Sequence, residues 1–265
     1  MKDKTKAPEK TGTEIAPGFF ETRRHIFWLP VWLTASAVMA CAGQVIASEF
    51  DEQESPTKPL PGVTVELDWE GFLKQSLTPA QELYKDSSAR GQEAYLHWLA
   101  SMIARVQPAH IPRAKVGRFG KIEPPVHFGM SYPGKPFFIV EWQLAPNAWL
   151  PPHCHPNASV CTVGLEGEAR IRNFEIVGQS PEFASRQTFL VRETHNQIIA
   201  PGRTNTLSST RDNIHTFQAG KSGARGIDIS SLHGPDVGFS FLDIAVKPKD
   251  VEGRIFEAVW KGTTI

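Results

Sequence analysis

From Ile122 onward the chain is a succession of short apolar and aromatic runs separated by turn residues. In the run 137–144, the apolar Trp142 and Leu144 enclose the polar Gln143, which is the period-2 alternation of a β-strand with one buried face. Short strands at regular spacing predict a sandwich or barrel, and these runs predict an all-β jelly roll. The ten predicted strands are 126–130, 137–144, 159–165, 169–177, 188–193, 204–209, 213–218, 226–231, 239–246 and 254–260.

Composition is consistent with this architecture and excludes one class of partner. The 21 Gly and 21 Pro suit many turns, while 16 Phe and 7 Trp allow a sizeable core. Lys+Arg and Asp+Glu both number 28, so the formal net charge is zero, and no basic run is longer than Arg23-Arg24. A nucleic-acid partner is therefore not expected.

One helical section, at about 68–107, precedes the strands. Thr78, Pro79 and Glu82 predict a helix start with a cap, a first-turn proline and an early acid. We expect Pro108 to end the section. A stripe at helical spacing predicts a face packed against the barrel, and consists of Tyr95, Trp98, Leu99, Met102, Ile103 and Val106.

The N-terminal residues 1–47 are predicted to be an export signal or a membrane anchor. Residues 25–47 contain no Asp, Glu, Lys or Arg, and a run of about 20 such residues is long enough to cross a bilayer. The preceding Thr22-Arg23-Arg24 resembles a twin-arginine signal, which directs folded proteins across a bacterial membrane. A lipoprotein-like signal ending at Cys41 and a buried structural helix are the alternatives.

Residues 48–62 are acidic and then proline-rich, so they are predicted to be a solvated linker. Residues 63–265 would then form one domain, comprising the helices and the barrel. With either a cleaved signal or a retained anchor, we expect this domain to lie outside the cytoplasm, in the periplasm or attached to the membrane.

Three histidines are the candidate metal ligands. His153 and His155 lie two residues apart in PPHCHP, and strand alternation would place both imidazoles on one face. His215, from a distant strand, would complete a facial set of nitrogen ligands that leaves positions open for water, substrate or O₂. Fe(II), Zn, Ni and Cu all suit imidazole, and Zn with three His and a water would be a hydrolytic or hydration centre instead. Five other histidines are not expected to be ligands, namely His25, His97, His110, His127 and His195.

The segment PPHCHPNASVCTVGLEGEARIRNFE resembles the first motif of the cupins, which fold as a double-stranded β-helix. In the usual cupin pattern a Glu ligand follows the second His by five residues, and a Gly follows that His by twelve. Gly167 occupies the glycine position, whereas Val160 occupies the Glu position. H-x-H-P-x-x-x-V, then NIHTFQA, GIDIS and His233-Gly234, are similar to the plant cysteine oxidase and cysteamine dioxygenase group. The similarity covers about 137–238.

The resemblance implies that His153, His155 and His215 bind Fe(II), and that Asp228 is a catalytic acidic residue near the iron, which would orient a substrate amine or a ligand imidazole. It implies a non-haem iron dioxygenase that adds O₂ to a thiol, giving a sulfinic acid. The substrate would be a small thiol or a peptide with an N-terminal cysteine. Asp212 departs from the pattern by replacing a glycine, and an exported member is unusual.

Two other functions are compatible with the same residues. One is a different three-histidine cupin oxygenase that cleaves a carbon–carbon bond, and the other is a non-catalytic exported cupin that binds a small ligand. Among the cysteines, Cys154 is expected to point away from the metal and Cys161 to face the barrel interior. Both are expected to be small buried hydrophobic residues without a disulfide.

Overall fold

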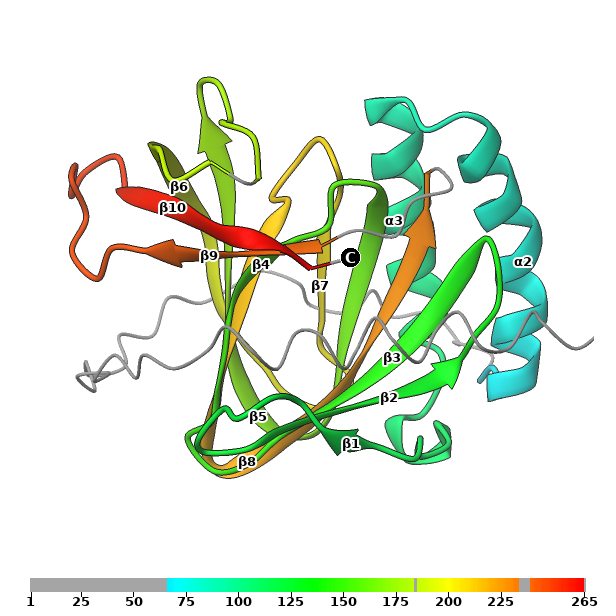
Figure 1. Ribbon diagram of the computed structural model, residues 1–265. Helices are drawn as coiled ribbons and strands as arrows, with labels where there is room; N and C mark the ends of the chain where they lie inside the picture. Colours follow the sequence, from blue (N-terminus) through cyan, green and yellow to red (C-terminus); the bar gives the residue numbers. More distant parts are fainter. Residues whose placement is uncertain (1–65, 184, 234–238, 265) are drawn as a thin grey trace, which may run out of the picture.

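The computed structural model describes residues 66–183, 185–233 and 239–264 (Figure 1). The predicted export segment 1–47 and linker 48–62 lie outside these residues. Within them, no helix is long and apolar enough to cross a membrane. The elements are α2 (Trp69–Lys85), α3 (Ala89–Ile103), the short 3₁₀ helix η2 (Pro108–His110), β1 (Gly117–Arg118), β2 (Val126–Tyr132), β3 (Phe137–Leu144), β4 (Trp149–Cys154), β5 (Ala158–Val177), β6 (Thr188–Ile199), β7 (Thr204–Leu207), β8 (Ile214–Leu232), β9 (Phe239–Ile244) and β10 (Ile255–Thr264).

The strands form a jelly roll organised around two long antiparallel strands, β5 and β8, which pair along most of their length. The N-terminal part of β5 and the C-terminal part of β8 belong to one half, in the order β1-β2-β3-β8-β5-β7. The other parts belong to the second half, in which β4, β9, β10 and β6 follow β8 and return to β5. The predicted all-β double-stranded β-helix with a leading helical section is confirmed.

Gly167 marks the bend where both long strands pass from one half to the other. It adopts a φ of 64°, and a Cβ at this position would lie 2.2 Å from the carbonyl oxygen of Gly223, which has a φ of 77°. Register shifts on both sides of Gly167 show that β5 bulges here without ending. The sequence predicted separate strands at 159–165 and 169–177, and this was wrong because the glycine permits a bend within one strand.

The two helices lie together against the outer face of the first half, on the side of the molecule opposite β9 and β10 (Figure 1). The predicted start at Thr78-Pro79 was wrong, because Pro79 lies inside α2 and the N-cap is Asp68, whose side chain accepts from the Gly71 amide. The buried face continues across the proline at helical spacing, so its packing outweighs the lost hydrogen bond. Buried α2 residues are Trp69, Phe72, Ser76, Ala80 and Leu83. The stripe predicted on α3 is confirmed, except that Trp98 is half-buried and Leu96 also belongs to it.

The interior between the two halves is filled by an apolar cluster that includes Trp142, Ile171, Phe217 and Phe241. Trp142 is 1% exposed and packs over Gly226. A Cβ on Gly226 would lie 2.1 Å from Cζ2 of that indole and 2.5 Å from the backbone oxygen of Val163. The glycine therefore makes room for the tryptophan that forms one wall of the interior.

We predict that Gly226→Ala destabilises the protein by about 3 kcal/mol, because the added methyl overpacks a site bounded by backbone. Chemical denaturation followed by circular dichroism would measure the change in the free energy of unfolding. Gly117→Ala is the matched control, since nothing lies within 4 Å of a Cβ there and its effect should be small. Equal stability of the two variants would contradict the packing argument.

Candidate metal centre

The three predicted histidines converge in the barrel interior. His153, in β4, is directly paired with His215 at the start of β8, and His155 immediately follows the end of β4. The Nε2 atom of His215 lies 2.9 Å from Nε2 of His153 and 3.0 Å from Nε2 of His155. His215 is fully buried, His153 is 6% exposed and His155 is half-buried. The structure therefore brings together all three residues that the sequence singled out.

These distances fit a shared metal ion. Two imidazole nitrogens about 2.1 Å from one ion and at right angles to each other are separated by about 3.0 Å, whereas tetrahedral angles would separate them by about 3.4 Å. The separations of 2.9 and 3.0 Å both correspond to right-angled pairs that include His215, and three imidazoles on one ion leave further positions open. Among the described residues, no carboxylate or thiolate joins this group of three histidines.

The protonation of the three rings also suits metal binding. Burial lowers the pKa of His153 to about 4, and burial together with the neighbouring imidazoles lowers the pKa values of His155 and His215 well below the usual range. Nδ1 of His153 lies 2.9 Å from the carbonyl oxygen of Pro151, which accepts but cannot donate. This ring therefore carries its proton on Nδ1 and presents the Nε2 lone pair to the interior.

Asn213 attaches the segment around His155 to the strand that carries His215. Its Oδ1 accepts from the backbone N–H of His155 at 2.9 Å, and its Nδ2 donates to the His155 carbonyl oxygen at 3.4 Å. His155 lies one residue past β4, and its backbone N–H also donates to the Asn213 backbone oxygen at 3.3 Å. The asparagine side chain adds to this backbone bond and keeps two of the three imidazoles in a constant relation.

The backbone conformation at Asp212 explains why a glycine was expected at this position and why Asp can replace it. Its φ is 55°, a conformation that glycine adopts freely and that Asp tolerates better than most residues. Its carboxylate is 2% exposed, forms an ion pair with Arg211, and lies 3.3 Å from Nδ1 of His195. Burial alone would raise the pKa of Asp212, but hydrogen bonds from His195 and Thr194 and the charge of Arg211 lower it below its usual value.

Asp228 lies on the same face of the sheet as Trp142 and is buried in the interior. Its Oδ1 accepts a 2.6 Å hydrogen bond from the Thr162 hydroxyl and a 3.3 Å bond from Nε1 of Trp142. Burial raises the pKa of Asp228 to about 6, and the two hydrogen bonds only partly oppose this shift. The charge of Asp228 therefore changes nearer to neutral pH than that of an ordinary aspartate.

Val160, which occupies the position of the usual cupin glutamate, also lies in apolar surroundings. Val160 is fully buried and belongs to a small cluster with Ala158, Leu207 and Leu232. The described histidines that were not expected to be ligands stay outside the group of three. Of these, His97 lies on the exposed side of α3.

The two described cysteines are free and buried. Cys154 points away from the histidines into a separate core behind the second half, as predicted. The expectation that Cys161 faces the interior was wrong, because Cys161 packs with the helices in the outer core. Strand alternation does not carry through the turn between β4 and β5, so the count from His155 fails. Burial raises the pKa of both thiols to about 12, so neither is a thiolate near neutral pH.

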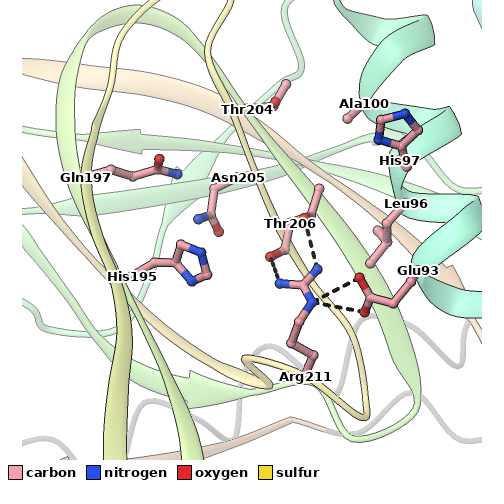
Figure 2. A pocket seen from close by; sticks show the side chains of 10 residues that line it. All are labelled: Glu93, Leu96, His97, Ala100, His195, Gln197, Thr204, Asn205, Thr206 and Arg211. Carbon is pink, nitrogen blue, oxygen red and sulfur yellow. Dashed lines mark hydrogen bonds and ion pairs between the residues drawn. The ribbon is translucent and has the colours of Figure 1, made fainter. Parts of the chain in front are cut away.

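A polar cavity of about 320 Å³ lies between α3, β6 and β7 (Figure 2). Arg211 forms one wall, and its Nε donates to both carboxylate oxygens of Glu93 at 3.0 Å. The cavity is further lined by Leu96, His97, Ala100, His195, Gln197, Thr204, Asn205 and Thr206. Because Arg211 also pairs with Asp212, this wall connects α3 to the turn that leads into His215.

Several residues around the histidines were missed from the sequence. Asn213 lies two residues before His215, and this spacing predicts that both side chains project from the same face of a strand. Asn173 occupies a position that alternation with Ala169 and Ile171 assigns to the buried face, and a polar residue there is informative. The carbonyl of Pro151 has no sequence signal, because every residue provides one.

The sequence matches no known protein-family profile and no curated protein. Solved structures with similarity include oxalate oxidase, with a TM-score of 0.32 and 18% identity over 44% of this chain and 54% of that one. A protein with a double-stranded β-helix domain from Klebsiella pneumoniae subsp. pneumoniae MGH 78578 has a TM-score of 0.33 and 12% identity, over 51% of this chain and 93% of that one. Pumpkin seed globulin has a TM-score of 0.34 and 12% identity, over 50% and 32%. The chain thus aligns with about half the length of oxalate oxidase, and its fold is assigned from its own strand pairing.

We predict that Asn213→Ala weakens Zn(II) binding by about tenfold or more, because the His155 backbone loses its side-chain anchor. Competition with a chromophoric chelator would measure the affinity. Asn196→Ala removes an exposed asparagine from β6 and should leave the affinity unchanged. The anchoring role would be refuted by equal affinities for the two variants.

A second prediction concerns Asp228→Asn in the metal-free protein. The folded-state pKa of about 6 exceeds the usual value for Asp of about 4, so the wild type loses stability as the pH rises through this window. The variant has no such penalty, and its Oδ1 still accepts from Thr162 and Trp142. The difference in unfolding free energy should be near zero at pH 4 and reach about 3 kcal/mol in favour of the variant at pH 8.

Urea denaturation across this pH range would measure the difference between Asp228→Asn and the wild type. Asp243→Asn, which replaces a carboxylate that is 62% exposed, is the control and should show no comparable pH dependence. Parallel stability curves for Asp228→Asn and the wild type would contradict the raised pKa.

Proposed function

We propose that this protein is a non-haem Fe(II) dioxygenase that converts a thiol and O₂ into a sulfinic acid. The observation that carries the proposal is the convergence of three neutral imidazoles with no carboxylate in the group. A facial set of three ligands leaves positions for both a thiol substrate and O₂. The motif similarity to thiol dioxygenases in the sequence supports the same activity.

His153, His155 and His215 would hold the iron through Nε2. When bound, the ferrous ion would supply the means to bring a thiolate and O₂ together and to reduce O₂ by the four electrons that sulfur loses. Both oxygen atoms end on sulfur, so thiol plus O₂ gives sulfinic acid with no other reductant. Because all three protein ligands are neutral, the site retains the full divalent charge and favours an anionic thiolate over a neutral ligand.

Asp228 is the proposed substrate-orienting group. Trp142 and Thr162 hold its Oδ1, which fixes the direction of the carboxylate. In its ionised form it would attract the amine of an aminothiol or of a peptide with an N-terminal cysteine. Burial beside the Trp142 ring strengthens this attraction, since charges interact more strongly where water is excluded.

We also propose that the domain works outside the cytoplasm, either exported by the twin-arginine route or anchored through residues 25–47. The support is the uncharged run of that segment behind Arg23-Arg24. Export in a folded state would suit a protein that acquires its metal before translocation.

The full-length protein loaded with Fe(II) should consume O₂ with at least one of cysteine, cysteamine, 3-mercaptopropionate or a Cys-initiated peptide, forming one sulfinate per O₂. An oxygen electrode combined with mass spectrometry of the product would measure this stoichiometry. His153→Ala should lose both iron and O₂ uptake, whereas His127→Ala, on β2 and outside the triad, should retain both.

Each contrary outcome points to a different function. Oxygen uptake with diketone or aromatic diol cleavage, and without sulfinate, would identify a carbon–carbon-cleaving oxygenase. Failure to bind metal stoichiometrically would identify a binding module. Stoichiometric iron without O₂ uptake on any of these thiols would overturn the thiol dioxygenase proposal.

A further inference from the structure

When Nε2 of His215 binds a metal, a chemical requirement falls on the other ring nitrogen, Nδ1. An imidazole that offers its Nε2 lone pair to a metal carries the ring proton on Nδ1, where it becomes a hydrogen-bond donor. His153 satisfies this requirement with the Pro151 carbonyl. Nδ1 of His215 is buried and has no hydrogen-bond partner among the described residues. A metal-bound His215 therefore needs an acceptor on that side.

A matching acceptor stands on the neighbouring strand. Asn173 of β5 is the direct cross-strand partner of His215, so the two side chains project from the same face of the sheet. Asn173 is fully buried, and its Oδ1 also has no hydrogen-bond partner among the described residues. The unpaired acceptor, Oδ1 of Asn173, and the unpaired donor position, Nδ1 of His215, thus belong to two residues that are paired across the strands. Either buried group without a hydrogen bond costs folding stability.

The orientation of Asn173 is set from its other side. Its Nδ2 donates to Oδ1 of Asn205 at 3.0 Å, and Asn205 is itself 6% exposed on β7. Asn205 also lines the polar cavity, where its side chain is visible beside His195 and Gln197 (Figure 2). Because Asn205 takes the amide N–H of Asn173, the oxygen of Asn173 remains available for another donor.

We propose that Asn173 is a positioning residue of the metal centre, which accepts the Nδ1–H of His215 when a metal is bound and is held in place by Asn205. This inference rests on the metal site of the proposed function and is independent of thiol oxidation. The hydrogen bond fixes the ring orientation and the tautomer in which Nε2 faces the other two imidazoles. His153 uses a backbone carbonyl for the same purpose, so its position is less sensitive to substitution.

The test is divalent metal binding by the full-length protein. Asn173→Leu keeps the approximate volume but removes the acceptor, and it should weaken Co(II) binding by about 10- to 100-fold and alter the Co(II) ligand-field spectrum. Asn173→Asp retains an acceptor and should bind Co(II) at least as tightly as the wild type. Gln197→Leu is the control, because Gln197 lies on β6 and lines the same polar cavity as Asn205. This variant should leave both affinity and spectrum unchanged.

A second readout reports the hydrogen bond itself. In Zn(II)-loaded protein labelled with ¹⁵N-histidine, the wild type should show a slowly exchanging Nδ1–H resonance from His215 that disappears in Asn173→Leu.

Wild-type Co(II) affinity and spectrum in Asn173→Leu would overturn the positioning role, as would failure of Asn173→Asp to retain affinity. If Asn173→Leu does not fold, the Asn173→Asp affinity and the wild-type resonance decide the question. These outcomes differ from failure of the proposed function, in which the wild type itself would bind no metal or would bind metal without oxidising thiols.

Discussion

The register in which β4, β8 and β5 pair is the constraint on which the metal centre depends. It places His153 opposite His215 on one side and Asn173 opposite His215 on the other. Side chains alternate between faces with a period of two, so a slip of one residue would turn an imidazole from the interior to the opposite core. The outward neighbours Cys154 and Ile214, buried in that opposite core, oppose such a slip because they would have to exchange places with the histidines.

Burial between the two halves then sets the charges. Removal from water keeps the three imidazoles neutral and raises the pKa of Asp228 towards neutrality. The same low-dielectric interior requires that polar groups be paired, which accounts for the hydrogen bonds that Thr162 and Trp142 donate to the acid. Trp142 in turn requires the absence of a side chain at Gly226. Packing and electrostatics of the site are therefore linked through one indole ring.

Alternation and turn residues predicted most of the architecture. Strand 137–144 has the predicted bounds, and β-structure occurs at each of the ten predicted runs. The errors arose where tertiary contacts outweigh local signals. Gly167 and Gly223 bend a paired strand instead of ending it, and Pro79 is tolerated because the buried face of α2 continues past it. The parity argument failed for Cys161 because a turn separates it from His155.

The sequence by itself determined the chemistry that this centre can offer: three imidazoles, an apolar Val160 where a carboxylate is usual, and an acid at Asp228. These follow from residue identities and from the two-residue spacing of His153 and His155, which the amino-acid sequence shows directly. Only the tertiary structure decided that three Nε2 atoms meet about one point, that burial keeps the rings neutral, and that Asn213 and Asn173 lie beside them. Each of these results depends on residues far apart in the chain, whose proximity is fixed by strand register and not by local pattern.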